Sequence, residues 1–208
     1  MSKGRLEAFS DGVIAIIITI MVLELKVPTG GQLADLVHLI PVFVSYLLSF
    51  TFVGIYWTNH HHLLHTASEV NGGILWANLH LLFWLSLIPF VTNWMGENFL
   101  SPWPVAIYGI PLLFSGVAYY VLSQALIRHH GKHSTLGIAV GKDVKGIISL
   151  VVYLIAIPIS FVYSLGAYIL YILVAIMWIV PDRRIENTVK TNQADTSNNK
   201  HQHSTSGR

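Results

Sequence analysis

The chain of 208 residues is 53% hydrophobic and only 11% charged, with a formal net charge of +2. An ordinary soluble domain has about 25% charged residues, so this composition excludes a soluble globular fold. The chain has no cysteine, which excludes disulfide bonds and thiolate metal sites. The lipid bilayer is therefore the expected surroundings, and no nucleic-acid partner is expected.

The apolar residues occur in blocks of about 20, the length at which a helix crosses a hydrocarbon core about 30 Å thick. These blocks predict six transmembrane helices, at residues 6–25, 36–58, 74–94, 105–127, 146–163 and 165–180. The last two are separated by a tight turn at residues 163–166. The expected fold class is thus an all-α integral membrane protein.

The chain becomes polar after Pro181, where Asn, Gln, Ser, Thr and His predominate. Such a composition cannot bury enough apolar surface to fold. Residues 1–181 are therefore expected to form one transmembrane domain, and residues 182–208 a disordered cytoplasmic tail.

The basic residues predict the orientation, because Lys and Arg concentrate in short cytoplasmic segments. With six spans and the N-terminus inside, only Lys26 lies outside. The eleven basic residues on the inside are Lys3, Arg5, Arg128, Lys132, Lys142, Lys145, Arg183, Arg184, Lys190, Lys200 and Arg208. Both termini are therefore expected in the cytoplasm. A cleaved signal peptide is the competing interpretation of the first block, but Asp11 interrupts that block and no small-x-small cleavage site follows it.

The first predicted helix separates into two faces when its residues are placed 100° apart. One arc contains Gly12, Ile16, Thr19, Ile20 and Leu23, and another, well away from it, contains Asp11, Ala15, Ile18 and Val22. The carboxylate of Asp11 and the apolar stripe therefore face different neighbours. Lipid contact or helix packing is the ordinary interpretation of such a stripe.

Each of the first three predicted helices contains a recognisable motif. The first helix contains Arg5-x-x-x-Phe9-Ser10-Asp11-Gly12, then Ala15-Ile16, Thr19 and Leu23-Glu24; the second and third contain Trp57-x-x-x-His61-His62, Leu75-Trp76-x-Asn78-Leu79 and Pro89-Phe90. Together they resemble the transmembrane protein 175 family of potassium-permeable channels over about the first 95 residues. The remaining helices agree with the family only in number and hydropathy.

The resemblance implies a homotetramer of six-helix subunits in the cell membrane of a prokaryote, permeable to potassium ions and without a cofactor. Its first helices would line a central pore with Ile16, Thr19, Ile20 and Leu23, the residues that share one arc. The sequence contains no TVGYG-like segment, so a carbonyl filter is not expected. An Ile16 collar would act as a gate, and Thr19 hydroxyls would give modest selectivity for K⁺ over Na⁺.

At the outer end of the same helix, fourfold symmetry would place Glu24 in a ring of carboxylates that attracts cations. An interfacial position, paired with Lys26, is the alternative for Glu24. Asp35 and Glu97 are also expected on the outer face.

Asp11 is expected to have a structural role, because a charge within a membrane helix costs about 2.5 kcal/mol or more unless it is paired. The resemblance places the Phe9-Ser10-Asp11 segment against the cytoplasmic ends of the second and third helices. The expected network contains Arg5, Phe9, Ser10, Asp11, Trp57, His61, His62 and Asn78. The histidine that pairs with Asp11 stays open at this point.

Two further interpretations belong to other classes. The clusters His60, His61, His62, His65 and His129, His130, His133 have spacings usable by a metal, as in membrane di-iron oxidoreductases. That chemistry needs about eight ligands, and no Asp or Glu joins either cluster, so no metal site and no enzyme are expected. A secondary transporter would show two matching halves, which Pro41, Pro89, Pro111 and Pro158 do not form.

Overall fold

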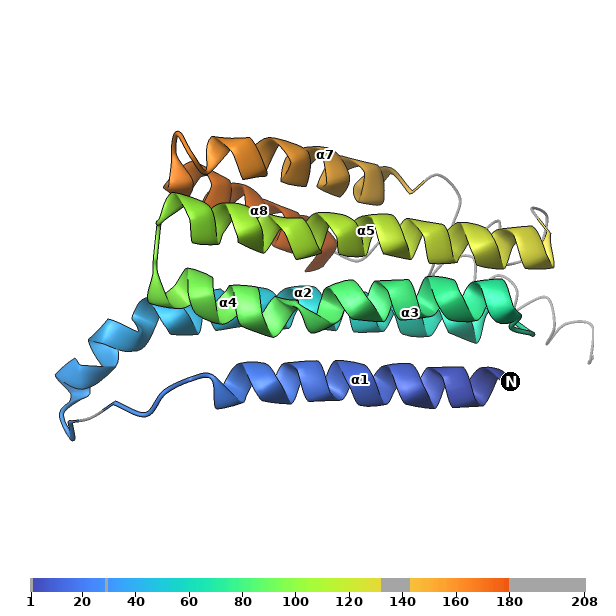
Figure 1. Ribbon diagram of the computed structural model, residues 1–208, viewed down its shortest axis with the longest axis horizontal. Helices are drawn as coiled ribbons and strands as arrows, with labels where there is room; N and C mark the ends of the chain where they lie inside the picture. Colours follow the sequence, from blue (N-terminus) through green and yellow to red (C-terminus); the bar gives the residue numbers. More distant parts are fainter. Residues whose placement is uncertain (1, 29, 132–142, 180–208) are drawn as a thin grey trace, which may run out of the picture.

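The structure is a computed structural model that describes residues 2–28, 30–131 and 143–179. Within these residues it contains helices and no strand (Figure 1). The elements are α1 (Lys3–Leu23), the 3₁₀ helix η1 (Leu33–Leu39), α2 (Ile40–His65), α3 (Gly72–Ser86), α4 (Ile88–Glu97), α5 (Pro102–His130), α7 (Val144–Ile159) and α8 (Ser164–Ile179).

These elements make six apolar spans in the described part of the chain. Four are long enough to cross a bilayer: Lys3–Leu23, Leu33–His65, Gly72–Glu97 and Pro102–His130. The other two, Val144–Ile159 and Ser164–Ile179, are shorter apolar helices. The prediction of an all-α membrane protein with six helices is confirmed. The predicted tail at 182–208 lies outside the described residues, as do Lys132, Lys142, His133 and every basic residue from Arg183 onward.

The third predicted helix is interrupted in the structure. It was expected to run continuously over 74–94, but α3 ends at Ser86 and α4 begins at Ile88. Pro89 occupies the first turn of α4, where its missing N–H group needs no helical partner. The two helices follow one another in the same span, so the span is retained with an interruption at Leu87.

The second predicted helix is longer than expected at its far end. It was predicted to end at Thr58, whereas α2 continues to His65. The histidines at 60–62 and 65 therefore belong to the last two turns of α2. Each of their side chains has a fixed direction on the helix, and neighbours in the sequence point about 100° apart.

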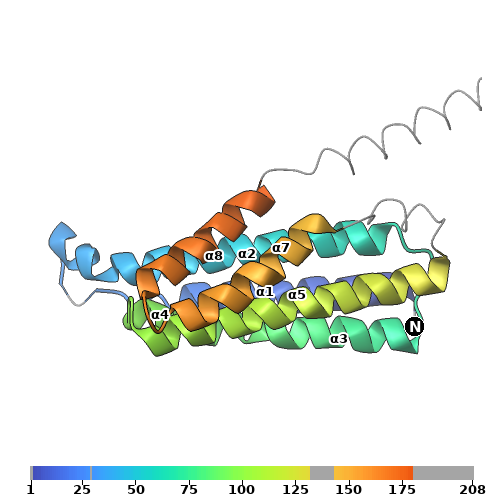
Figure 2. The same ribbon diagram turned by 90° about the horizontal axis from the view of Figure 1, so that it is seen from above.

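The helices form layers with α1 at one side of the bundle (Figure 1). α1 packs against α2, α3 and α4, and α5 packs between α3 and α7. Figure 2 shows α2 and α3 on either side of α1, and Figure 1 shows α7 and α8 on the side of the bundle opposite α1. The start of α1, the α2–α3 connection and the end of α5 lie at the same end of the molecule (Figure 1).

The close packing of α4 on α2 depends on Gly96. A Cβ atom at this position would lie 2.8 Å from the Cα atom of Val42 and 3.4 Å from its Cβ atom. Backbone atoms cannot rotate away as a side chain can, so any larger residue must move the two helices apart.

Gly96→Ala is expected to destabilise the protein by about 1–3 kcal/mol, because it overpacks this contact. Gly54→Ala is the matched control, since a Cβ atom at Gly54 in α2 meets nothing within 4 Å. The control is expected to leave stability unchanged or to raise it by up to about 1 kcal/mol through helix propensity. Thermal unfolding of the purified variants measures both, and equal midpoints would contradict the expectation.

Candidate functional site

One face of α1 is buried against the rest of the subunit and the opposite face is uncovered. The buried residues are Leu6, Ser10, Ile14, Ile17 and Met21. The exposed residues include all of the predicted pore-lining positions, Ile16, Thr19, Ile20 and Leu23, together with Gly12. The exposed fraction is 58% for Ile16, 41% for Ile20 and 80% for Leu23. The subunit alone therefore leaves this apolar stripe without a protein neighbour.

Thr19 is the polar residue within the stripe. Its hydroxyl group donates to the backbone carbonyl of Ile16 at 2.9 Å, one turn earlier in the same helix. The hydroxyl hydrogen is therefore engaged with the backbone. The lone pairs of the Thr19 oxygen stay available to accept a hydrogen bond from water or to contact a cation.

Glu24 caps the far end of α1 and is exposed. Lys26 does not pair with it: the ammonium group of Lys26 forms an ion pair with the carboxylate of Glu97 at the end of α4. The hydrogen bond that Lys26 donates to Glu97, and then the charge of Glu97, raise the pKa of Lys26 above its ordinary value, and the charge of Glu24 adds to the effect. Glu24 makes no ion pair among the described residues, so the direct pairing of Glu24 with Lys26 is not present in this structure.

A buried hydrogen-bond network fixes α1 to α2 and α3. The Ser10 hydroxyl donates to the Leu6 carbonyl at 2.8 Å and accepts from Nδ2 of Asn78 at 2.9 Å. Oδ1 of Asn78 lies 2.7 Å from Nε2 of His60. Because the amide nitrogen donates to Ser10, the amide oxygen is the acceptor and Nε2 of His60 carries the hydrogen. Ser10 and Asn78 are fully buried and His60 is nearly so.

The histidine in this network is His60, which the sequence analysis did not include. His61 and His62 were expected there, but both are exposed, and the ring of His61 stacks on Trp57 instead. A sequence signal for His60 exists: it lies seven residues after the buried Val53, and therefore on the same face of α2.

Asp11 lies outside the buried network. Its carboxylate accepts a hydrogen bond from Nε1 of Trp57 at 3.0 Å, and both side chains are exposed. No hydrogen bond from a histidine to Asp11 occurs among the described residues. Arg5 and Phe9 are also exposed on α1 and do not join either group. The expected single network is thus two separate contacts, Ser10 with Asn78 and Asp11 with Trp57.

The histidine clusters do not gather into a metal-binding group in the described residues: no three His, Asp or Glu side chains there are placed to hold an ion. His129 and His130 instead contact the α2–α3 connection, and His80 accepts a hydrogen bond from Nε1 of Trp84 at 2.9 Å. His133 lies outside the described residues.

Comparison with known proteins identifies relatives over most of the chain. Residues 5–89 match the family described as "Endosomal/lysosomal potassium channel TMEM175". A potassium channel of Chryseobacterium sp. (strain P1-3) is 54% identical over 192 residues, which are 92% of this chain and 100% of that protein. The human endosomal/lysosomal proton channel TMEM175 is 38% identical over 96 residues, 40% of this chain and 19% of the human one.

A solved structure agrees with these relatives. The crystal structure of a lysosomal potassium-selective channel TMEM175 homolog from Chamaesiphon minutus superposes with a TM-score of 0.74 at 28% identity, covering 86% of this chain and 96% of that one. The matched relatives are ion channels rather than enzymes. Sequence identity over nearly the whole chain, together with the shared fold, shows that this multi-pass membrane protein belongs to the TMEM175 family.

Proposed function

We propose that the protein is a homotetrameric, potassium-permeable cation channel whose four α1 helices line the pore. The observation that carries this proposal is the uncovered stripe of Ile16, Thr19, Ile20 and Leu23, opposite the face of α1 that packs on the bundle. Further support comes from the potassium-channel relatives of matching length and fold. Four copies around an axis would cover the stripe and place it at the centre.

The physics of such a pore follows from the order of residues along α1. Four Ile16 side chains make an apolar collar, which empties of water when narrow and passes a partly dehydrated cation when slightly wider. One turn outward, the Thr19 oxygens replace some of the ion's water ligands. Hydroxyl ligands select weakly, and the chain has no TVGYG-like segment to form a carbonyl filter, so modest K⁺ over Na⁺ selectivity is expected. Beyond the collar, Glu24 adds negative charge at the outer mouth.

The proposed location is the cell membrane of a prokaryote, with both termini in the cytoplasm. The excess of Lys and Arg on one side of the six spans supports this orientation. The relative from Chryseobacterium matches this chain over its whole length and supports the prokaryotic assignment.

Cation flux through the purified protein in liposomes tests the proposal, with potassium, sodium and chloride gradients compared at equal protein. We expect potassium to exceed sodium and chloride to be excluded. A chloride flux equal to that of potassium, or no flux from a correctly assembled protein, would refute the channel. Native mass spectrometry of the same sample measures the number of subunits.

Asp11→Ala is expected to impair assembly more than selectivity. The change removes the acceptor for Nε1 of Trp57, 3.0 Å away, and so loosens α1 against α2. Size-exclusion chromatography should show a smaller fraction of tetramer, and the tetramer that remains should keep its ratio of potassium to sodium flux. Normal assembly with an altered ratio would instead place Asp11 in the pore.

A further inference from the structure

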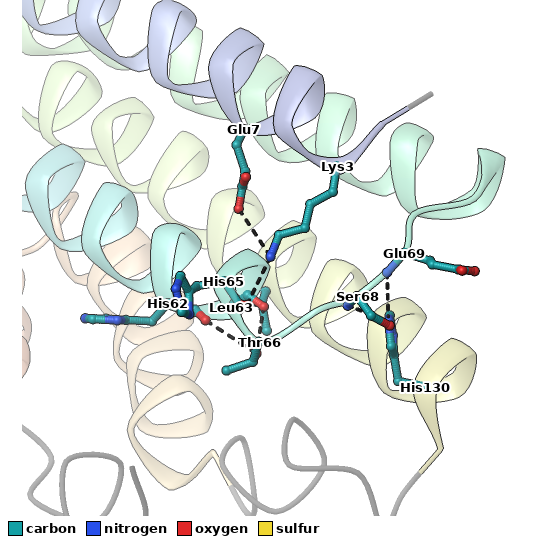
Figure 3. Close-up of polar contacts among 9 residues, drawn as sticks. All are labelled: Lys3, Glu7, His62, Leu63, His65, Thr66, Ser68, Glu69 and His130. Atoms are coloured by element: carbon teal, nitrogen blue, oxygen red, sulfur yellow. Dashed lines mark hydrogen bonds and ion pairs between the residues drawn. The ribbon is translucent and has the colours of Figure 1, made fainter. Parts of the chain in front are cut away.

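The end of α5 holds the connection between α2 and α3 through His130. Nε2 of this ring lies 3.1 Å from the backbone nitrogen of Ser68 and 3.3 Å from that of Glu69 (Figure 3). Nδ1 of the same ring lies 2.9 Å from the backbone carbonyl of Leu126, one turn earlier in α5. The ring thus bridges two segments that are about sixty residues apart in the sequence.

These contacts allow only one protonation state of His130. The Leu126 carbonyl can only accept, so Nδ1 carries a hydrogen and donates it. The two backbone N–H groups can only donate, so Nε2 must offer a lone pair. An imidazolium has hydrogens on both nitrogens and cannot accept either bond. The contact therefore requires the neutral ring.

His129 makes a second contact of the same kind. Its Nδ1 lies 3.2 Å from Nδ2 of Asn71, the residue that caps α3. Oδ1 of Asn71 accepts from the backbone nitrogen of Ile74 at 3.0 Å, which fixes the amide orientation and makes Nδ2 the donor. His129 therefore also accepts and is also neutral here. The two rings are 5.1 Å apart, so protonation of both would place like charges side by side.

The α2–α3 connection is also tied to α1. The ammonium group of Lys3 donates to the backbone carbonyl of His65 at 3.0 Å and lies 3.7 Å from the Glu7 carboxylate (Figure 3). His65 is the last residue of α2, and the Thr66–Asn71 segment follows it. A movement of this segment therefore changes the hydrogen bond that holds Lys3, in the first turn of α1.

Few acidic groups lie near the His129 and His130 rings to stabilise a positive charge on them. Glu69 is the acidic residue of the connection, and its side chain extends away from the His130 ring (Figure 3). From α1 come Lys3 and Glu7, which pair with each other. The remaining ionisable groups at this end of α2 and α5 are His61, His62, His65, Arg128 and His129. No carboxylate contacts either ring among the described residues, so in that part of the chain a proton on either ring has no compensating partner.

We propose that His130, with His129 beside it, forms a pH-sensitive clasp: protonation of the His130 ring releases the α2–α3 connection at Ser68 and Glu69, loosens the anchoring of α1 through Lys3, and so changes permeation. The release of the α2–α3 connection is argued only from the hydrogen bonds of the two rings. The effect on permeation rests on the proposed channel function.

The direction of the effect follows from linkage. The closed clasp needs Nε2 of His130 as an acceptor, so only the open form can take up a proton on that ring. Lowering the pH therefore favours opening, and raising the pH favours the closed clasp.

Amide hydrogen exchange of Ser68 and Glu69, in the purified protein in lipid nanodiscs, tests the clasp. Between about pH 8 and about pH 5.5, corrected protection factors should fall in the wild type. His130→Gln should remove most of this pH dependence, because the glutamine carbonyl can accept at the position of Nε2 and does not titrate. His130→Ala, which has no acceptor, should show low protection at both pH values.

His62→Gln is the matched control, since His62 is exposed at the same end and its ring makes no hydrogen bond among the described residues. This control should keep the wild-type response, and the amide of Val91 in α4 should stay protected in every sample. Unchanged protection at Ser68 and Glu69 in the wild type, or a full response in His130→Gln, would overturn the clasp.

Liposome flux then tests the regulation, with the pH changed only on the side of the N-terminus. The wild type should respond and His130→Gln should not. If exchange responds and the wild-type flux does not, the clasp opens without controlling permeation, and the regulatory step is wrong. Absence of flux in all variants at all pH values would refute the channel function, while the exchange result would still decide the clasp.

Discussion

Ile16→Asn is expected to raise potassium flux into liposomes about tenfold at equal protein, which corresponds to a barrier lower by about 1.4 kcal/mol. The Ile16 side chain is 58% exposed on the uncovered face of α1. In the proposed tetramer four such side chains meet at the axis and exclude water. An amide at this position offers both donors and acceptors, so water and hydrated cations can occupy the collar continuously.

Val22→Asn is the matched control for this prediction. Val22 lies on the same helix and is 46% exposed, but it belongs to the arc of Asp11 and not to that of Ile16. An asparagine there adds the same polar group without reaching the proposed axis. Equal flux in the two variants, with both assembled as the wild type is, would show that α1 does not line the pore with Ile16.

Asn78→Ala is expected to lower the free energy of unfolding by about 1–3 kcal/mol, which shifts the thermal midpoint by roughly 5 °C. The substitution removes the donor to Ser10 and the acceptor for His60 at once. Both remaining groups are buried where water does not reach them. Nε2 of His60 loses its acceptor, and the Ser10 hydroxyl loses its donor while it keeps its bond to the Leu6 carbonyl, so part of the desolvation cost is no longer offset.

Asn59→Ala provides the comparison for Asn78. The amide of Asn59 donates only to the backbone carbonyl of Ile55 in its own helix, at 2.9 Å. Its removal breaks no side-chain hydrogen bond between helices among the described residues and is expected to change the midpoint little. Thermal unfolding of both variants in the same detergent decides the matter: shifts of equal size would mean that the Ser10–Asn78–His60 network does not hold α1 to the bundle.

The six spans could be predicted from the sequence because each is a long apolar block, and block length is a property of the chain alone. The division of the first helix into two faces could be predicted for a similar reason, since helical geometry fixes the angle between Ile16 and Asp11. The interruption at Leu87 had a local signal in Pro89, but apolar residues continue on both sides and conceal it.

The partners within the site could not be predicted, because they depend on how one helix is rotated against another. His60, His61 and His62 differ by about 100° steps around α2, and only the rotation of α2 within the bundle decides that His60 faces Asn78. Likewise, Lys26 is two residues from Glu24 but pairs with Glu97, which α4 brings to the same end of the bundle. The family motif was the wrong guide to the histidine, and proximity in the sequence was the wrong guide to the partner of Lys26.

The length of α7 has a consequence for the surrounding lipid. Its 16 residues, between the caps Asp143 and Ser160, span about 24 Å, less than the roughly 30 Å of a typical hydrocarbon core. Side chains along its outer face, among them Val151 and Leu154, are exposed in the subunit. Acyl chains beside α7 must shorten or tilt to match it, at a cost of a fraction of a kcal/mol for each ångström of mismatch. The protein is therefore expected to thin the bilayer locally along α7 and to favour membranes built from shorter acyl chains.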